Sequence, residues 1–529
     1  MFKEQKHFET ILKQGKITRR EFVARLSALG LTAALSPGFF STSAQASQPK
    51  KGGRLRTGLA GGATTDSLDP ATMNDLMAMD INWQIRNNLV EIDHNLNPIP
   101  ELAESWEASP DAKKWVFNLR KGVEFHNGKT LGTEDVIYSI NHHRGEASKS
   151  AAKSIVDQIT DIQADGANKV IFTLKGGNAD FPFILSDYHL SIFPAETKKK
   201  AFEKGIGTGG YILEAWEPGV RAFAKRNPNY WKQGRAHFDE VETLGIADVN
   251  ARTNALKTGR IDHMNRCDLK TIHLLEKDPR VKVIKFSGTW HYTMPMMTDI
   301  APFDNNDVRL ALKYALDREL MLKMFLRGYG SIGNDHPIAP IQRYCASELP
   351  QRKYDPDKAK FHLKKAGLEN HTFKLHTSTV GGFIDQSMLF QEAAAKAGIK
   401  IELVQHPADG YWSDIWLKKP FVGCYWSGRA TEDWMFSTSY SADASWNDSH
   451  WKHDKFNRLL IEARAELNEA KRREMYVEMQ RIVRDEGGVI VHLFKDYVEA
   501  TNLKIRHGEI AGNWGQDGCR FAERWWFAS

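Results

Sequence analysis

Apolar and polar residues alternate at residues 115–119, and the apolar positions then change to helical spacing at residues 133–140. The alternation predicts a half-buried strand, because successive side chains of a strand point to opposite faces of the sheet. Asn127-Gly128 between the two runs favours a tight turn. We expect the helix to begin at Thr133, whose hydroxyl would cap the first backbone N–H groups, followed by two acids at the positive end of the helix dipole. The pattern predicts a strand, a turn and a capped helix.

Strands and helices alternate along much of the remaining chain. The expected helices cover residues 310–325, 388–397 and 459–484. The expected strands cover residues 169–174, 281–286, 373–376, 399–404 and 489–494. This order is typical of an α/β layer.

The first 46 residues have the features of an export signal, so we leave them out of the fold prediction. Thr18-Arg19-Arg20-Glu21-Phe22 resembles the twin-arginine export motif, residues 23–40 are modestly apolar, and Ala44-Gln45-Ala46 supplies the small residues that a signal peptidase accepts. We expect cleavage near Ala46 and a periplasmic protein exported by the twin-arginine route. A retained N-terminal amphipathic helix is the alternative. No later stretch is apolar enough to span a bilayer, which predicts a soluble mature protein.

Removal of residues 1–46 changes the charge of the chain. This segment holds seven of the 72 Lys and Arg residues and three of the 66 acidic residues, so the formal net charge falls from +6 to +2. A nearly balanced surface gives no concentrated basic face for nucleic acid. The four cysteines are widely separated and form no C-x-x-C pair, so they indicate neither a metal cluster nor a redox motif. The remaining length, about 480 residues, is enough for two or three domains.

The segment from Trp115 to Arg144 resembles the signature of one protein family, the peptide/nickel family of extracytoplasmic solute-binding proteins. These proteins are the ligand-capturing components of ABC importers, and they commonly read W-x-F-x-L-R-x-G-V-x-F-H-D/N-G-x-x-x-T-A-E-D-V-x-x-S here. Fourteen residues match in order: Trp115, Phe117, Leu119, Arg120, Gly122, Val123, Phe125, His126, Asn127, Gly128, Glu134, Asp135, Val136 and Ser139. Gly132 stands just before the Thr-Glu-Asp cap and departs slightly from the pattern.

Other parts of the chain extend the resemblance. Residues 100–106 match P-x-L-A-x-S-W, residues 207–211 match G-T-G-P-Y with Gly210 in place of the proline, and residues 302–305 read P-F-D-N. A phosphate-binding role for the glycine-rich loop is excluded, because no Lys-Ser/Thr pair follows it.

The resemblance implies an α/β, two-lobed periplasmic-binding-protein fold of the class that has an extra subdomain in the first lobe, with the lobes joined by a hinge. Lobe I would cover residues 47–287, with the extra subdomain at about 85–205. Lobe II would cover residues 288–493, and residues 494–529 would return to lobe I.

The expected ligand site lies between the lobes, where two surfaces enclose a small solute. The resemblance places residues 421–434 at the cleft. In peptide-binding members an acid in this loop pairs with the ammonium group of the ligand, a role open to Glu432 or Asp433. Trp426 and Trp434 would form flat apolar walls, and Arg429 would hold a carboxylate or a phosphate. In the alternative, Trp426 belongs to the core and Arg429 pairs with Glu432 or Asp433.

A second set of candidate ligand neighbours lies near the start of the mature chain. Thr65 and Asp66 belong to a loop that borders the cleft in the family, although turn formation explains Asp66 equally well. Two departures argue against an ordinary dipeptide as ligand. Residues 377–383 contain no arginine, and Met297 occupies the approximate place of a frequent asparagine. Opine-like compounds, modified amino acids, longer peptides and sugars stay open.

We expect no metal site, no cofactor and no enzymatic activity. His142-His143 and His450-x-x-His453 raise a nickel or haem-type ligand as an alternative, but a metal site needs three or four converging ligands. No H-E-x-x-H, G-x-S-x-G or P-loop motif occurs in the sequence. The expected partners are the small solute and the ABC permease subunits of the inner membrane, which would recognise a monomeric protein closed around its ligand. A secreted enzyme and a periplasmic sensor on the same fold are the competing classes.

Overall fold

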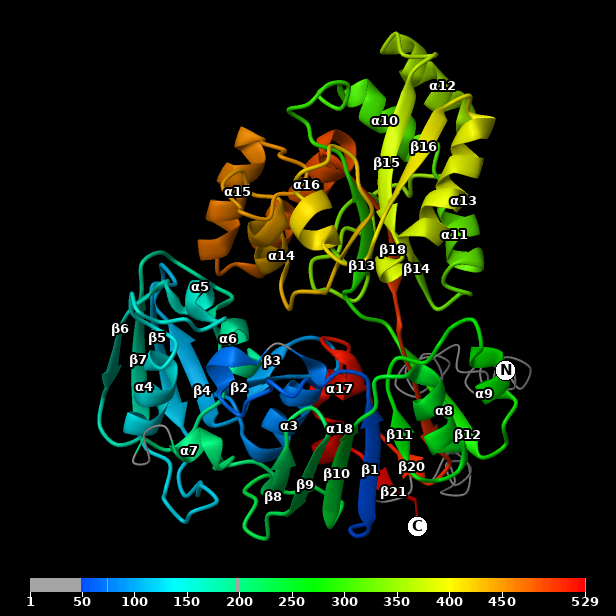
Figure 1. Ribbon diagram of the computed structural model, residues 1–529. Helices are drawn as coiled ribbons and strands as arrows, with labels where there is room; N and C mark the ends of the chain where they lie inside the picture. The colour runs from blue at the N-terminus through cyan, green and yellow to red at the C-terminus, as the bar shows by residue number, and fades with distance from the viewer. Residues whose placement is uncertain (1–48, 74, 196–199, 529) are drawn as a thin grey trace, which may run out of the picture. The chain divides into compact units, whose positions relative to one another are not determined.

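The computed structural model describes residues 49–73, 75–195 and 200–528 (Figure 1). The predicted signal peptide at residues 1–46 lies outside these residues, so its cleavage and its export route stay predictions. Within the described residues, no helix combines the length and the apolar character that crossing a membrane requires.

A seven-stranded mixed sheet forms the base of the first part, which we call lobe I. Its strands have the order β12-β19-β11-β1-β10-β9-β8. They are β1 (Arg54–Leu59), β8 (Tyr211–Glu217), β9 (Arg221–Arg226), β10 (Glu240–Gly245), β11 (His263–Met264), β12 (Val281–Phe286) and β19 (Tyr497–Asn502). Strand β1 runs parallel to β10 and β11, whereas the other neighbours are antiparallel. Because β19 lies between β12 and β11, the sheet includes a strand from near the C-terminus.

Helices and short strands complete lobe I. They include α3 (Leu76–Ile85), α8 (Val249–Lys257), α9 (Ile272–Glu276), α17 (Gly515–Cys519), α18 (Phe521–Arg524) and the pair β20 (Ile505–Arg506) and β21 (Trp526–Phe527). The side chain of Asp75 accepts hydrogen bonds from Met77 N and Ala78 N, at 2.7 and 3.1 Å, and so caps α3. This cap fixes the start of a helix that borders the cavity described below.

The signature segment lies in a separate antiparallel sheet with the order β4-β5-β7-β6. The strands are β4 (Ala103–Ala108), β5 (Lys114–Leu119), β6 (Ile159–Ala164) and β7 (Lys169–Leu174), and the nearby elements are β2 (Val90–Ile92), β3 (Pro98–Pro100), α4 (Thr133–Asn141), α5 (Lys153–Val156), α6 (Phe181–Ile184) and α7 (Lys200–Glu203). Trp115 and Phe117 of β5 pack with Phe172 and Phe181 in a buried aromatic cluster. The predicted strand at residues 115–119 and the predicted helix at residues 133–140 are confirmed as β5 and α4. Their apolar side chains belong to one hydrophobic core.

The prediction that Thr133 caps α4 is wrong. Gly132 is the N-cap residue and has no side chain to offer, while Thr133 is already the first residue of the helix. Asp135 makes the reciprocal bond of a capping box, because its Oδ2 accepts a hydrogen bond of 2.9 Å from Gly132 N. The departure at Gly132 thus moves the cap by one residue.

A second α/β part, which we call lobe II, contains a sheet with the order β14-β18-β13-β17 and the parallel pair β15-β16. The strands are β13 (His291–Pro295), β14 (Gly330–Ile332), β15 (Thr372–Ser378), β16 (Lys400–His406), β17 (Cys424–Trp426) and β18 (Val489–Lys495). The helices are α10 (Asn306–Tyr314), α11 (Arg318–Met324), α12 (Pro356–Lys365), α13 (Phe383–Lys396), α14 (Glu432–Ser439), α15 (Asp454–Ala465) and α16 (Glu469–Glu486) (Figure 1).

Two predicted helices of lobe II are each divided in the structure. Residues 310–325 contribute to α10 and α11, and the Asp317 side chain accepts a hydrogen bond of 2.9 Å from Leu320 N to begin α11. Residues 459–484 contribute to α15 and α16, where Asn468 accepts from Ala470 N and Lys471 N at 3.1 Å. In both places an N-cap side chain starts a new helix inside an uninterrupted apolar spacing.

The chain crosses between the two lobes twice. The first crossing, residues 287–290, joins β12 to β13, and the second crossing, at Asp496, joins β18 to β19. Each crossing therefore connects a strand of one sheet directly to a strand of the other.

Candidate ligand-binding site

A cavity of about 1160 Å³ is bordered by both lobes and by both crossings. Lobe I contributes the start of α3, residues 184–189 and the C-terminal segment around Trp514, and lobe II contributes residues 427–434. Ligand sites commonly measure about 300–1,000 Å³. The cavity therefore has room for a solute larger than a single amino acid.

Aromatic rings form much of the cavity wall. The lining includes Tyr188, Trp290, Tyr425, Trp434, Trp446, Tyr497 and Trp514. The rings of Trp290 and Tyr425 lie 5.2 Å apart at 45°, and those of Tyr188 and Trp514 lie 5.9 Å apart at 85°. Ring pairs of this kind present large flat apolar surfaces that are held in place by their neighbours.

Arg429 lines the cavity without an acidic partner. Its Nη1 donates hydrogen bonds to the carbonyl oxygens of Ser427 and Gly428, at 2.9 and 3.1 Å, and its guanidinium carbon lies 5.8 Å from the centre of the Trp434 ring. Burial lowers the pKa of Arg429, an effect that Tyr188 and Asp187 oppose. No acid of the described residues forms an ion pair with it, so Nε and Nη2 stay available for an anionic group.

The two candidate acids of the loop are both engaged within lobe II. Glu432 is buried, and its Oε1 accepts a hydrogen bond of 2.8 Å from Tyr344 N. Burial raises the pKa of Glu432 to about 7. Asp433 lines the cavity, but its carboxylate pairs with Arg464 Nε at 3.1 and 3.2 Å. Burial raises the pKa of Asp433, and the Arg464 charge opposes this effect.

The remaining predicted site residues lie outside the cavity lining. Trp426 is 6% exposed and packs against Trp416 and Trp446, with ring centres 5.9 and 6.0 Å apart. Thr65 is exposed, and Asp66 Oδ2 accepts a hydrogen bond of 2.8 Å from Ala63 N in a local turn. Of the seven predicted residues, the structure brings Arg429, Asp433 and Trp434 together at the cavity. Their part in binding stays a prediction.

Several lining residues were not predicted from the sequence, because they become neighbours only in the folded chain. Trp290 lies on the first crossing, Lys495 and Tyr497 flank the second, and Trp514 comes from the C-terminal segment. None of them belongs to a local motif. The one feature of the sequence that pointed to them was the predicted position at which the chain passes from lobe I to lobe II.

The C-terminal segment reaches the cavity through an unusual left-handed turn. Gln516, Asp517, Gly518 and Cys519 have φ values of 53°, 56°, 66° and 57°. This conformation costs about 1–2 kcal/mol for each residue other than glycine. Asp517 offsets the cost, since its Oδ1 accepts from Ala511 N at 2.8 Å and from an Arg524 N–H at 2.8 Å, and its Oδ2 accepts from Trp525 Nε1 at 3.0 Å.

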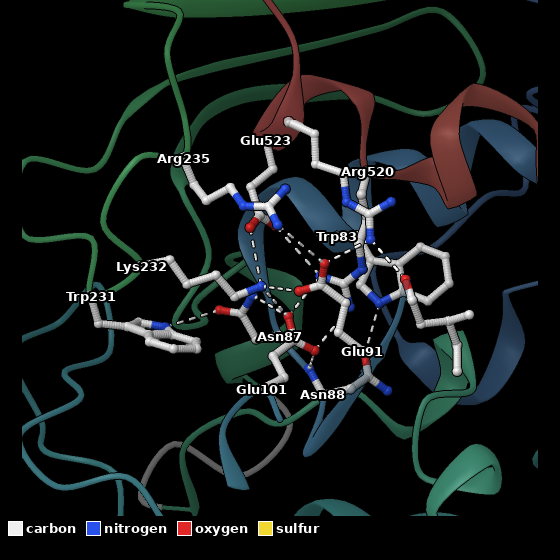
Figure 2. Close-up of polar contacts among 12 residues, drawn as sticks. Trp83, Asn87, Asn88, Glu91, Glu101, Trp231, Lys232, Arg235, Arg520 and Glu523 are labelled. Carbon is white, nitrogen blue, oxygen red and sulfur yellow. Dashed lines mark hydrogen bonds and ion pairs between the residues drawn. The ribbon is translucent and has the colours of Figure 1, made fainter. Parts of the chain in front are cut away.

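A buried ionic network holds the same segment against the rest of lobe I (Figure 2). Lys232 Nζ lies 2.5 Å from Glu91, 2.7 Å from Glu101 and 3.0 Å from Glu523. Arg520 donates to both oxygens of Glu101, at 2.7 and 2.9 Å. Every acid here has a basic partner, which is the condition for burying charge without a large cost. The network holds Arg520, whose backbone N–H donates a hydrogen bond of 3.1 Å to Gln516 O in the cavity lining.

Burial alone would raise the pKa of Glu91, but Lys232 and Arg524 hold this pKa well below its usual range. Arg524 Nη2 lies 2.7 Å from Glu91, while its Nη1 reaches Asp517. Arg524 therefore links the ionic network to the left-handed turn.

The histidines that suggested a metal site pair with acids outside the cavity lining. His142 Nε2 lies 2.7 Å from Asp69, and His450 Nδ1 lies 2.9 Å from Asp299. No group of three His, Cys, Asp or Glu side chains in the described part of the chain could hold a metal ion. The four cysteines are free thiols.

Comparison with known proteins identifies the family. The model of the bacterial extracellular solute-binding proteins, family 5 (middle region), matches residues 97–448. The glutathione-binding protein GsiB of Pectobacterium atrosepticum is 25% identical over 464 residues, which cover 84% of this chain and 90% of that protein.

Solved structures share the fold. The periplasmic binding protein DppA from Helicobacter pylori, in complex with the peptide STSA, superposes with a TM-score of 0.74 at 24% identity, covering 91% of this chain and 99% of that one. The periplasmic binding protein AgaA from A. tumefaciens R10, in complex with agropinic acid, gives a TM-score of 0.72 at 23% identity, covering 90% and 99%. The predicted two-lobed α/β fold is confirmed.

These findings also confirm the predicted function at the level of the family, because the relatives are solute-binding proteins of ABC importers. The chain belongs to family 5 of the bacterial extracellular solute-binding proteins.

Proposed function

We propose that this protein captures a small peptide-like or amino-acid-derived solute between lobes I and II in the periplasm and delivers it to an ABC permease of the inner membrane. The observation that carries the proposal is the cavity of about 1160 Å³, which both lobes and both crossings border. A site built from two lobes can exclude water from a solute on all sides. In this proposal the protein acts as a monomer and has no enzymatic activity.

Arg429 and the aromatic walls support a solute that carries a carboxylate. A guanidinium binds a carboxylate through two parallel hydrogen bonds, and Arg429 lines the cavity while all of its own hydrogen bonds come from Nη1. The solutes named for the relatives, glutathione, the peptide STSA and agropinic acid, are all carboxylic acids. They are therefore suitable first ligands to test.

Capture by closure of the lobes fits this arrangement. The proposed lobes are residues 47–287 and 288–493, with residues 494–529 returning to lobe I. A ligand that contacts both lobes stabilises the closed form, and only a difference in affinity between the open and closed forms can shift the balance between them. The proposal includes export through a twin-arginine signal at residues 1–46, with cleavage near Ala46.

Titration calorimetry of the purified mature protein tests the proposed function. Glutathione, STSA, agropinic acid and a neutral disaccharide would each be added to the wild type, and each would be incubated with it to measure turnover. The proposal expects saturable one-to-one binding of at least one amino-acid-derived solute, without chemical change. Conversion of a solute into product would favour the competing class, a secreted enzyme.

A further inference from the structure

Two more cations line the cavity beside the crossings, and neither takes part in an ion pair within the described residues. Arg266 follows β11 in lobe I, and Lys495 ends β18 immediately before the second crossing. Two other basic residues of the lining are each close to an acid: Arg464 pairs with Asp433, and His189 pairs with Asp187. Like Arg429 and the exposed Lys175, Arg266 and Lys495 line the cavity without an ion-pair partner among the described residues, and these two lie beside the crossings.

Lys495 is held against an aromatic wall. Its Nζ lies 4.8 Å from the centre of the Trp290 ring, and Trp290 in turn packs on Tyr425. The backbone of Lys495 is fixed by the β18 ladder and by a hydrogen bond of 2.9 Å from Lys495 N to Trp290 O. Burial and then the Arg266 charge lower the pKa of Lys495 to about 8, so the ammonium form still prevails at neutral pH.

Arg266 is presented by a backbone conformation that is uncommon for an arginine. Its φ is +49°, in the left-handed region that disfavours residues with a side chain. Both sides of the residue are fixed: its carbonyl accepts from Arg252 Nη2 at 3.3 Å, and the next amide, Cys267 N, donates to Val498 O at 3.0 Å. Two cations kept together in this way repel each other unless an anion lies between them.

The acids nearby do not supply that anion. Glu499 lies 3.1 Å from His263 and also accepts from Gln516 N at 2.7 Å. Burial raises the pKa of Asp496, and a hydrogen bond with Ser287 opposes this effect. No ion pair joins Asp496 or Glu499 to Arg266 or Lys495 in the part of the chain that the structure describes.

We propose that Arg266 and Lys495, together with the rings of Trp290 and Tyr425, form an anion subsite at the crossing side of the cavity, which binds a carboxylate attached to a flat or apolar part of the solute. This subsite rests on the proposed function and adds to it a specificity for organic acids. It is distinct from Arg429, whose charged and aromatic neighbours are Asp187, Tyr188 and Trp434. A solute with two carboxylates would engage both positions.

Binding of three acids and their carboxamides tests the subsite. Glutathione, STSA and agropinic acid, each with its fully amidated counterpart, would be titrated into the wild type and into Lys495→Gln and Arg266→Gln. Lys495→Arg tests whether a positive charge at this position is enough for binding of the acid. Lys504→Gln and Arg260→Gln are matched controls, because both residues are exposed and lie outside the cavity lining. Circular dichroism would check that each variant is folded.

The expected result is that the best-bound acid loses roughly tenfold or more in affinity in Lys495→Gln and in Arg266→Gln. Lys495→Arg and the two controls should retain the wild-type Kd, and the amide should bind more weakly than the acid to the wild type. Unchanged affinity of the acid in both glutamine variants would overturn the subsite, as would equal binding of acid and amide. Binding of a neutral solute alone would overturn the subsite and leave the proposed function standing.

Discussion

At the scale of single residues, the loop at residues 427–434 contains side chains that face the cavity and side chains that support the loop. Arg429 and Trp434 line the cavity, whereas Glu432 is buried against the backbone of Tyr344. Neighbouring positions of one motif thus have different roles, because α14 begins at Glu432 and directs successive side chains to different faces.

Arg429→Ala is expected to weaken binding of a carboxylate solute by roughly tenfold or more, because the charge-assisted hydrogen bonds of the guanidinium are lost. The midpoint of thermal unfolding should change little, since Arg429 bonds only to its own loop. Calorimetry and thermal unfolding measure the two quantities, with Arg260→Ala as the control. An unchanged Kd would remove Arg429 from the site.

Glu432→Gln is expected to change how stability depends on pH. The raised pKa of Glu432, about 7 against an ordinary 4.5, means that the folded protein binds this proton more tightly than the unfolded chain. The free energy of unfolding should therefore fall as the pH rises from about 4.5 to about 7. Glutamine keeps the acceptor for Tyr344 N and removes the titration.

The measurement is denaturant unfolding of wild type and Glu432→Gln at pH 5 and pH 8. Relative to the wild type, the variant should gain stability on the order of 1–3 kcal/mol between these two pH values. If the free energy of unfolding changed equally with pH in the two proteins, titration of Glu432 would not be the cause of the change.

At the scale of elements, the alternation of strands and helices was predictable because hydrophobic periodicity is local. The strand at residues 281–286 is β12 without change, and residues 169–174 are β7. The prediction of one continuous helix at residues 310–325 was wrong, because the apolar spacing continues through Asp317 although this residue caps a new helix. Its capping role depends on the turn before it. Periodicity detects a buried face and is insensitive to a break in the backbone.

The cavity was less predictable than the fold, for a physical reason. The 427–434 loop follows from a family motif, but Trp290, Lys495 and Trp514 meet it only because the chain crosses between the lobes twice, from β12 to β13 and from β18 to β19. Contacts between such distant segments depend on topology and have no local pattern to reveal them.

The left-handed turn at residues 516–519 gives a prediction at the same scale. Asp517→Asn removes the charge that pairs with Arg524 and is expected to destabilise the protein by about 3 kcal/mol, because a buried guanidinium loses one of its two acidic partners. Chemical denaturation measures the loss, with Asp409→Asn at an exposed position as the control. Full retention of stability would contradict the anchoring role of Asp517.

At the scale of the whole molecule, one buried ion pair connects the lobes directly. Arg472 of α16 lies 2.7 Å from Asp180, and both side chains are buried. Asp180 immediately precedes α6 in lobe I, close to the cavity. Contacts of this kind would contribute to the closed form on which ligand capture depends.

Closure of the lobes is expected to reduce the radius of gyration when a ligand binds. Small-angle X-ray scattering of the wild type with and without saturating solute measures this change. In Asp180→Asn the weakened pair should reduce both the compaction and the affinity. Identical scattering curves for the free and bound wild type would contradict capture by closure.

The central claim is that the protein holds an intact, amino-acid-derived solute in its cavity. Mass spectrometry of the small molecules released from the natively purified protein tests this claim most directly, followed by rebinding of the identified compound to wild type and Arg429→Ala. The account predicts a carboxylic acid of peptide or opine type, released in stoichiometric amount and bound more weakly by the variant. A released compound without a carboxylate, bound equally by both proteins, would contradict it.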